Sequence, residues 1–200
     1  MPEKISFRLF FFIFFIFLIS LDAFAQYTID PEEYLIYSTV IDSWFIKSDI
    51  ELLIIRDYTS LDESLETLED NLDYLSQVIF DLSIDTIRDF KAKNTHSYPL
   101  KNFFNQNKGY KLITDEEIDE IFDTGGWKEF YLRYPKSNGI LAFSRVGFNS
   151  DKTQCLVYAS NQEDKLIAEG FYFLLNKGGY NNWLIQNRQR TWGTYHREID

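Results

Sequence analysis

The chain has 200 residues, a formal net charge of −11 and an aromatic content of 18%. Nucleic acids and anionic membrane surfaces are bound by clustered Lys and Arg, so this charge argues against both as partners. The single cysteine, Cys155, excludes an internal disulfide, and an apolar core must therefore hold the fold. Cys155 lies in an alternating strand pattern, which predicts a buried thiol rather than a reactive one.

Residues 1–25 have the features of a secretory signal peptide. Lys4 and Arg8 precede an apolar run over residues 9–19, and Ala23 and Ala25 form a small-x-small cleavage site. The run is short for a membrane span of about 20 residues, so we expect cleavage and a periplasmic or secreted protein. The alternative is an N-terminal anchor that leaves the rest of the chain facing the periplasm.

Helix start signals recur through the first two thirds of the chain. Pro31 favours a first helical turn, and Ser60, Ser83 and Thr114 are capping residues for three further helices. Apolar spacing predicts helices over residues 31–47, 60–79, 83–94, 115–124 and 127–134, and a short buried strand over 51–58. The helix at 60–79 has an acidic outer face, which we interpret as a solvated surface; the alternative is a docking or divalent-cation surface.

From Gly139 the apolar period changes from that of a helix to that of a strand. Four strands joined by short turns are predicted over residues 140–148, 153–160, 165–175 and 183–190. Short connections predict an antiparallel meander, and the strand at 51–58 is its natural fifth member. We therefore expect residues 26–200 to form a single α+β domain, with N-terminal helices packed on one face of a mostly antiparallel, four- to five-stranded sheet.

The candidate chemical groups lie on this predicted sheet and in one loop. A hairpin centred between residues 150 and 151 pairs Arg145 with Leu156. Glu169 shares a strand face with apolar residues, and desolvation raises the pKa of a buried carboxyl group toward the range useful for acid–base chemistry. Glu169, Arg145 and His96 are therefore candidate catalytic residues of a hydrolase-like enzyme, with Arg145 holding an anionic substrate.

Glu169 also has a structural interpretation. In this interpretation Glu169 forms an ion pair with Arg145 or Arg188, or lies at a solvated edge of the sheet. A shifted pKa does not separate this case from catalysis, because structural ion pairs perturb pKa values as catalytic sites do.

A non-enzymatic binding module is the function that we favour. Tyr, Trp and Arg are enriched on recognition surfaces, and the candidate ligand-binding residues on the predicted sheet are Arg145, Tyr158, Tyr172 and Trp183. The expected partner is a peptide, a small ligand or another envelope protein. A third interpretation, an acidic inhibitor of a basic protein, rests on the net charge and the acidic helix.

The sequence contains no cofactor or metal motif. Its two histidines, His96 and His196, have neither a cysteine partner nor zinc-ligand spacing. The glycine pairs at residues 125–126 and 178–179 lack the spacing of a phosphate-binding loop. We therefore expect no cofactor and no metal site.

One strand motif resembles a known pattern. FSRVGFN at residues 143–149 is followed by Asp151, Gln154 and the pair Val157 and Tyr158, and later by GFYFLL at 170–175 and by Trp183. This pattern resembles one found in small exported bacterial proteins of unknown function. The resemblance covers roughly the sheet and implies export and an α+β domain, without an activity or site residues.

Overall fold

The structure, a computed structural model, describes residues 28–45, 49–60 and 75–195. The chain divides into two units, Met1–Asp30 and Pro31–Asp200, and the fold reported below is that of the second unit. The expected signal peptide and most of the expected helix at 60–79 lie outside the described residues. Among the residues described, no helix has both the length and the apolar character needed to cross a membrane.

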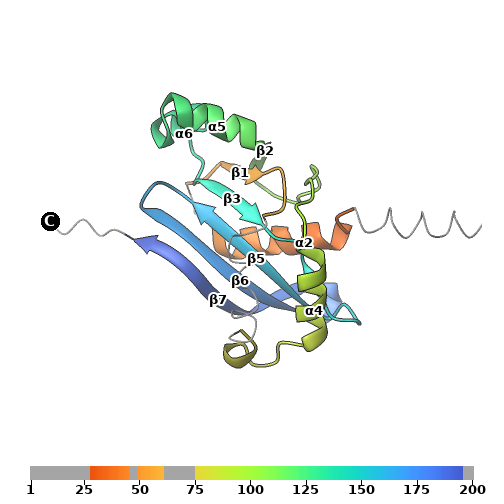
Figure 1. Cartoon of the computed structure of the whole chain (residues 1–200). Coiled ribbons are helices and arrows are strands. Elements are labelled where there is room, and N and C mark those ends of the chain that lie inside the picture. Colours follow the sequence, from red (N-terminus) through yellow and green to blue (C-terminus); the bar gives the residue numbers. More distant parts are fainter. Residues whose placement is uncertain (1–27, 46–48, 61–74, 196–200) are drawn as a thin grey trace, which may run out of the picture. The chain divides into compact units, whose positions relative to one another are not determined.

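One mixed sheet organises the second unit (Figure 1). Its strands are β1 (Leu52–Arg56), β2 (Gly109–Ile113), β3 (Ile140–Phe143), β4 (Gly147–Phe148), β5 (Gln154–Gln162), β6 (Ile167–Lys177) and β7 (Trp183–Tyr195). They follow the order β2-β1-β3-β5-β6-β7, and β4 pairs with β5 beside this path. β1 runs parallel to both β2 and β3, and the other pairings are antiparallel.

The described helices flank this sheet. They are α2 (Pro31–Val40), α4 (Ile84–Lys93), α5 (Asp115–Thr124) and α6 (Trp127–Arg133), with a π-helical turn η1 (Ile41–Phe45) after α2 and a 3-10 turn η3 (Gly179–Asn181) between β6 and β7. Two predicted caps are confirmed, because the side chain of Ser83 accepts the N–H of Asp85 and that of Thr114 accepts the N–H of Glu117.

The α+β class and the mostly antiparallel sheet are confirmed, but the expected strand count and pairing are not. β2 was not predicted from the sequence. It begins with Gly109 and only Ile113 in it is buried, so its residues do not alternate between buried and exposed. β1 is parallel to its neighbours, since the segment between Arg56 and Gly109 is a long crossover that includes α4.

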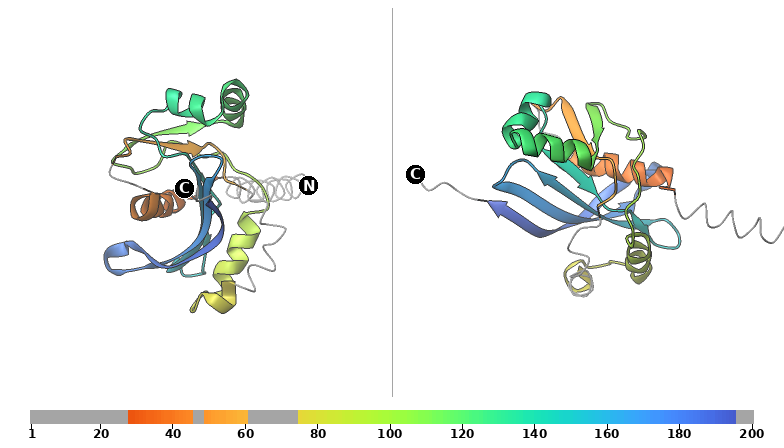
Figure 2. Two further views of the ribbon diagram at one scale, coloured as in Figure 1. Left: turned by 90° about the vertical axis from the view of Figure 1, so that its left-hand side faces the viewer. Right: turned by 45° about the horizontal axis from the view of Figure 1, so that its top comes forward.

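Helices lie on both faces of the sheet, which corrects the expectation that they cover one face (Figure 2). On one face Phe173 of β6 meets Phe45 of η1, with ring centroids 6.4 Å apart. On the other face Tyr172 meets Phe90 of α4, at 5.8 Å. Neighbouring residues of a strand point to opposite faces, so the apolar run at 171–175 belongs to a strand that is covered on both sides.

β7 forms one edge of the sheet as an irregular strand. Its register with β6 shifts between Gly170 and Phe171 and again between Leu174 and Leu175. Bulges of this kind twist an edge strand and interrupt the row of main-chain groups that an added strand needs for pairing. The outer edge of β7 is therefore a poor template for another strand.

A charged cluster joins β2 to α5 and α6. Lys111 Nζ donates hydrogen bonds to Glu117 Oε1 at 2.5 Å and to the Tyr134 hydroxyl at 2.8 Å, and that hydroxyl donates to Glu117. Burial alone would raise the pKa of Glu117, but the hydrogen bonds from Lys111 and Tyr134 outweigh it and hold that pKa below its ordinary value. The cluster therefore stabilises the fold while Glu117 is ionised.

Glu117→Gln is expected to lower the free energy of unfolding at neutral pH by about 1 kcal/mol, because a part-exposed, charge-assisted hydrogen bond is lost. Since the folded-state pKa of Glu117 is depressed, its contribution is complete above the unfolded-state carboxyl pKa of about 4.3. It is lost as the pH falls through the folded-state pKa. Denaturant titrations from neutral to acidic pH measure this loss against the exposed control Glu116→Gln, and a pH-independent difference contradicts the role.

Candidate ligand-binding cleft

The expected first strand of the C-terminal sheet is interrupted by a bulge at residues 144–146. Phe143, at the end of β3, pairs with Ala159, whereas Gly147, at the start of β4, pairs with Leu156. Four steps along one strand therefore match three along the other, which places one extra residue in between. The predicted hairpin register is wrong already in β4, where Leu156 pairs with Gly147 and not with Arg145, because the hairpin is centred between residues 151 and 152 rather than between 150 and 151.

Side chains of α2 bind one side of this bulge. Glu33 Oε2 accepts the Val146 N–H at 2.9 Å, and the Tyr37 hydroxyl donates to the Ser144 carbonyl at 3.0 Å. Glu33 also holds the Arg145 guanidinium through both carboxylate oxygens, with Arg145 Nη2 2.7 Å from Glu33 Oε1. The side chains of Arg145 and Glu33 are 4% and 0% exposed, so this ion pair is shielded from water.

The buried ion pair sets the protonation of its surroundings. Burial alone would lower the pKa of Arg145, but the hydrogen bonds and charge of Glu33 outweigh it and raise that pKa. Burial, followed by the charge of Glu33, raises the pKa of Tyr37 well above its ordinary value. Arg145 therefore stays charged and Tyr37 stays a hydrogen-bond donor near neutral pH, as befits structural groups.

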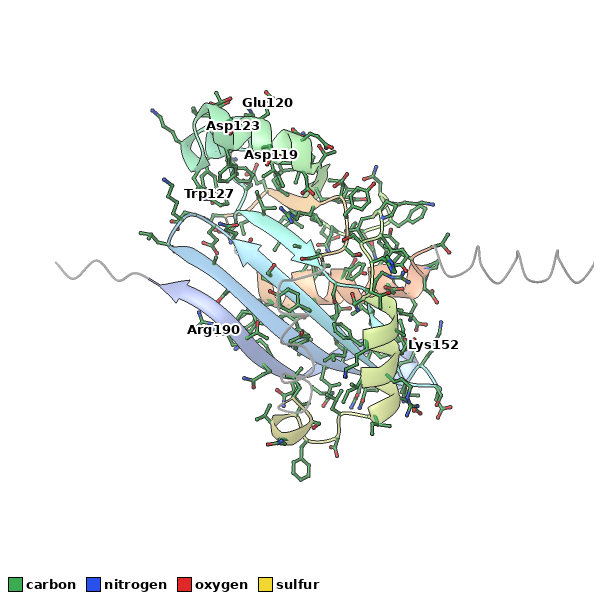
Figure 3. All side chains as sticks on the ribbon, viewed as in Figure 1. Asp119, Glu120, Asp123, Trp127, Lys152 and Arg190 are labelled. Carbon is green, nitrogen blue, oxygen red and sulfur yellow. The ribbon has the colours of Figure 1, made fainter. Side chains whose placement is uncertain are left out.

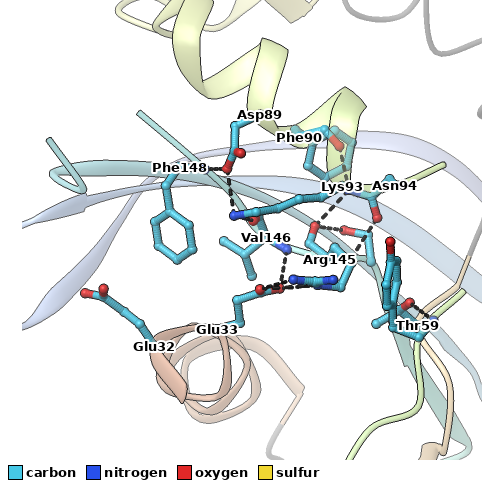
Figure 4. Close-up of polar contacts among 12 residues, drawn as sticks. Glu32, Glu33, Thr59, Asp89, Phe90, Lys93, Asn94, Arg145, Val146 and Phe148 are labelled. Atoms are coloured by element: carbon cyan, nitrogen blue, oxygen red, sulfur yellow. Dashed lines mark hydrogen bonds and ion pairs between the residues drawn. The ribbon is translucent and has the colours of Figure 1, made fainter. Parts of the chain in front are cut away.

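Side chains at the end of α4 bind the other side of the bulge. Asn94 contacts both main-chain groups of Arg145, accepting its N–H at 2.8 Å and donating to its carbonyl at 3.0 Å. Lys93 Nζ donates to the Val146 carbonyl at 3.1 Å (Figure 4). Main-chain groups that leave the sheet ladder are thus satisfied by side chains from two helices.

α4 also lies directly against β4. A Cβ atom built on Gly147 would come within 2.4 Å of the Phe90 main-chain nitrogen, so only glycine permits this approach. Asp89 of α4 accepts the Phe148 N–H at 2.7 Å. The outer edge of β4 is therefore covered by the helix, which fixes the distance between α4 and the β4–β5 turn.

A cleft of about 450 Å³ opens between α4 and the β4–β5 turn, next to the bulge. Its two walls are α4 and the segment that follows β4. The hydrogen bonds of Asn94 and Asp89 and the close approach of Gly147 to Phe90 hold α4 against the bulge and β4, so these contacts set the width of the opening. The lining residues are Asp85, Arg88, Asp89, Ala92 and Lys93 from α4, and Phe148, Asn149, Ser150 and Lys152 from β4 and the turn.

On the α4 wall each carboxylate is paired with a cation of the same helix. Arg88 Nη1 lies 2.9 Å from Asp85 Oδ1, and Lys93 Nζ lies 2.7 Å from Asp89 Oδ2. The first pair is at the exposed rim, whereas the second is more buried and is linked to β4 through Asp89. This wall therefore presents fixed, internally neutralised charges.

Lys152 supplies a cation on the opposite wall. Its main chain has a φ angle of 51°, and its Nζ lies 5.5 Å from the Phe148 ring centroid and 3.7 Å from Glu32 Oε2. The other carboxylate oxygen of Glu32 holds Lys177 at 2.7 Å. Figure 3 shows Lys152 beside α4, far from the labelled acidic residues of α5.

Glu169 and Arg145, two of the three candidate catalytic residues, are not brought together. Glu169 is part-exposed and lies opposite Asn161 of β5. The bulge is bonded to β5 at Tyr158, on the order of 10 Å away along that strand. Arg145 is held by Glu33 instead, a partner from the first helix that the sequence analysis did not identify.

The four candidate ligand-binding side chains do not form an exposed surface. Tyr158 and Tyr172 are 2% and 1% exposed and pack ring to ring beneath α4. Trp183 is 6% exposed and lies against Phe148, and Arg145 is buried with Glu33. Their burial follows from helices on both faces of the sheet, where the prediction placed helices on one.

The other reactive side chains have structural or isolated positions. His96 is exposed, with Nδ1 2.9 Å from the hydroxyl of Thr95. The prediction of a buried thiol is confirmed, and burial raises the pKa of Cys155 well above its ordinary value. Ser144 Oγ accepts the Tyr158 N–H at 2.9 Å within the bulge. Within residues 28–45, 49–60 and 75–195, no group of three or more His, Cys, Asp or Glu is placed to hold a metal ion.

The residues that bind the bulge were not predicted from the sequence. In the sequence, Glu33 is an acid of the kind that stabilises the first turn of a helix, and Asn94 is a residue that commonly ends one. The available signal was Arg145 itself, since an arginine within an apolar strand needs a buried acid. The chain contains 31 acidic residues, and nothing in the sequence marks Glu33 among them.

Glu33→Gln is expected to lower the free energy of unfolding by about 3 kcal/mol, because Arg145 would remain buried without its counter-charge. Guanidinium unfolding curves measure the loss. The double variant Glu33→Gln with Arg145→Met should recover part of it, since the lone buried charge is then absent. A double variant that loses the sum of the two single effects contradicts the pairing.

Gly147→Ala is expected to lower the free energy of unfolding by about 2 kcal/mol, because the added methyl group would push the Phe90 main chain, and α4 with it, away from β4. Gly179→Ala is the matched control, since a Cβ atom there meets nothing within 4 Å. Equal unfolding midpoints for the two variants in urea would contradict the close packing of α4 on β4.

Comparison of the chain with protein-family models, curated proteins and solved structures gave no match. The function is therefore inferred from the geometry of the cleft and from the residues that build it.

Proposed function

We propose that the chain is an exported, non-enzymatic binding module of the cell envelope that holds a small ligand in the cleft between α4 and the β4–β5 turn. The observation that supports this most is the cleft itself, at about 450 Å³ and lined by charged, polar and aromatic side chains. Concave sites that place polar groups around a ligand are typical of small-molecule binding, and seven of the nine residues that line this cleft are charged or polar. Export rests on the signal-peptide pattern of residues 1–25.

A small ligand is favoured over an extended peptide by the condition of the sheet edges near the cleft. The Phe148 N–H, on the outer edge of β4, is occupied by Asp89. β7 carries two register shifts along its pairing with β6. Peptides that bind as an added strand need a regular row of open main-chain groups, and neither edge offers one.

Binding without catalysis is favoured by the placement of the candidate catalytic groups. The hydrolase alternative requires Glu169 and Arg145 in one accessible site, with or without His96. Arg145 is engaged by Glu33 in the interior, and His96 lies exposed beside Thr95. The carboxylates in the cleft are themselves held by cations, which suits recognition better than proton transfer.

A screen of neutral and charged fragments smaller than the cleft tests this function. Binding is read from amide chemical shifts of Ala92, Ser150 and Lys152 in the isotope-labelled protein, and we expect a subset of fragments to move these signals together. Ala92→Trp should abolish the response, because Ala92 is exposed on the cleft wall and a bulky side chain there fills the opening.

The matched control for that variant is Lys128→Trp, which places the same side chain on an exposed position of α6. It should leave the response intact. If no fragment moves the cleft signals, or if Ala92→Trp responds as the intact protein does, the cleft is not a ligand site and the proposed function is wrong.

A further inference from the structure

β2 is the edge strand at the end of the sheet opposite to β7. Among the described strands, β1 lies on one side of it and none lies on the other. The N–H of Gly109 donates to the Glu51 carbonyl, and the Ile113 carbonyl accepts a hydrogen bond from the residue after β1. Because alternate residues of a strand direct their main-chain groups to opposite sides, the N–H and C=O groups of Tyr110 and Leu112 point away from β1.

This outer row of main-chain groups is open and regular. In the part of the chain that the structure describes, no hydrogen bond reaches the outward groups of Tyr110 and Leu112. The edge of β4 is occupied by Asp89, and the pairing of β7 is interrupted by two register shifts. β2 keeps an unbroken register with β1 over its whole length. Of these three described edges, β2 therefore has the row of groups that an added strand needs.

Both faces of β2 are packed, which holds the strand in place for pairing. On one face the Tyr110 ring packs against Phe104, with ring centroids 5.3 Å apart. On the other face Lys111 is neutralised by Glu117, and Ile113 packs with α5 and α6. A strand that is already ordered loses little conformational entropy when another strand pairs with it.

The helix that follows β2 is strongly acidic. Six of the ten residues of α5 are aspartate or glutamate, and Figure 3 shows Asp119, Glu120 and Asp123 together on it. Glu116, Asp119 and Asp123 are exposed and form no ion pair within the described residues. Burial and then the charges of the first turn of α5 raise the pKa of Asp57, whose N–H donates to the last residue of β2. The negative charge of α5 therefore extends to the end of β2.

We infer that the outer edge of β2 binds an extended, basic segment of a partner protein as an added strand. Residues paired across strands lie on the same face, so side chains beside Tyr110 and Leu112 extend the buried apolar row of Leu53 and Ile55. The alternate side chains of the segment lie on the face that α5 covers, where lysine or arginine is attracted by the carboxylates of α5. The segment therefore alternates apolar and basic residues. The β2 edge is separate from the cleft, so this inference goes beyond the proposed function and is independent of it.

Two capped hexapeptides test the inference, one of alternating lysine and valine and one of alternating glutamate and valine. In titrations of the isotope-labelled protein, the lysine peptide should shift the amide signals of Tyr110 and Leu112 and bind about 10-fold more tightly than the glutamate peptide. Near saturation it should slow hydrogen exchange of these two amides about 10-fold, whereas the Lys111 amide, which the register directs to β1, keeps its rate. Unprotected Tyr110 and Leu112 amides, or equal affinities of the two peptides, overturn the inference.

Leu112→Pro removes one outward N–H and leaves the bonds to β1 in place, since proline is tolerated where the N–H of an edge strand faces solvent. It should weaken binding of the lysine peptide at least about 10-fold, because a hydrogen bond is lost and the ring obstructs the added strand. Leu112→Ala keeps the N–H and should weaken binding only about 3-fold through lost side-chain contact. Equal affinities of the two variants contradict pairing at this edge.

Lysine peptides N-methylated at every valine or at every lysine test the same pairing on the unaltered protein. The N–H groups of one set point toward β2 and those of the other set point away, so one of the two peptides should lose binding and the other keep it. Binding by both contradicts an added strand. A protein that is dimeric without peptide and already protects the Tyr110 and Leu112 amides also overturns the inference, because a second copy of the chain then occupies the edge.

Discussion

The buried carboxylate of Glu33 is the group on which the arrangement of α2, the bulge and α4 depends. One side chain neutralises Arg145 and accepts the Val146 N–H, so it ties the first helix to a segment more than a hundred residues later. A bulge removes main-chain groups from the sheet ladder, and each of them needs a partner once buried. The partners come from Glu33 and Tyr37 on one side and from Lys93 and Asn94 on the other.

This constraint also explains why the cleft exists. The bulge and Gly147 bring α4 onto β4, where a larger residue would clash with Phe90. The β4–β5 turn then faces one side of α4 across an opening rather than packing flat against it. The charged residues at that opening therefore lie on segments whose distance from each other is set by buried contacts. Such a site can bind a ligand without rearrangement of the main chain.

Local signals in the sequence predicted local structure well. Ser83 and Thr114 cap helices as expected, and the alternating pattern around Cys155 placed the thiol in the interior. Prediction failed where the determining contact was distant in the sequence. Glu169 was chosen as a candidate because it lies in an apolar row, but the buried acid that pairs with Arg145 is Glu33. The presence of Arg145 in a strand predicts a buried carboxylate but does not identify which one.

The sequence by itself determined the α+β class, most of the helix boundaries and the antiparallel C-terminal strands, since caps, turns and periodicity act between near neighbours. Only the tertiary structure decided that β2 joins β1 in parallel, that both faces of the sheet are covered and that residues 144–146 bulge. The same holds for the cleft and its charges. Each of these features depends on contacts between residues far apart in the chain. Which residues pair is decided by the whole fold, because every buried polar group needs a partner and every apolar face must be covered at the same time.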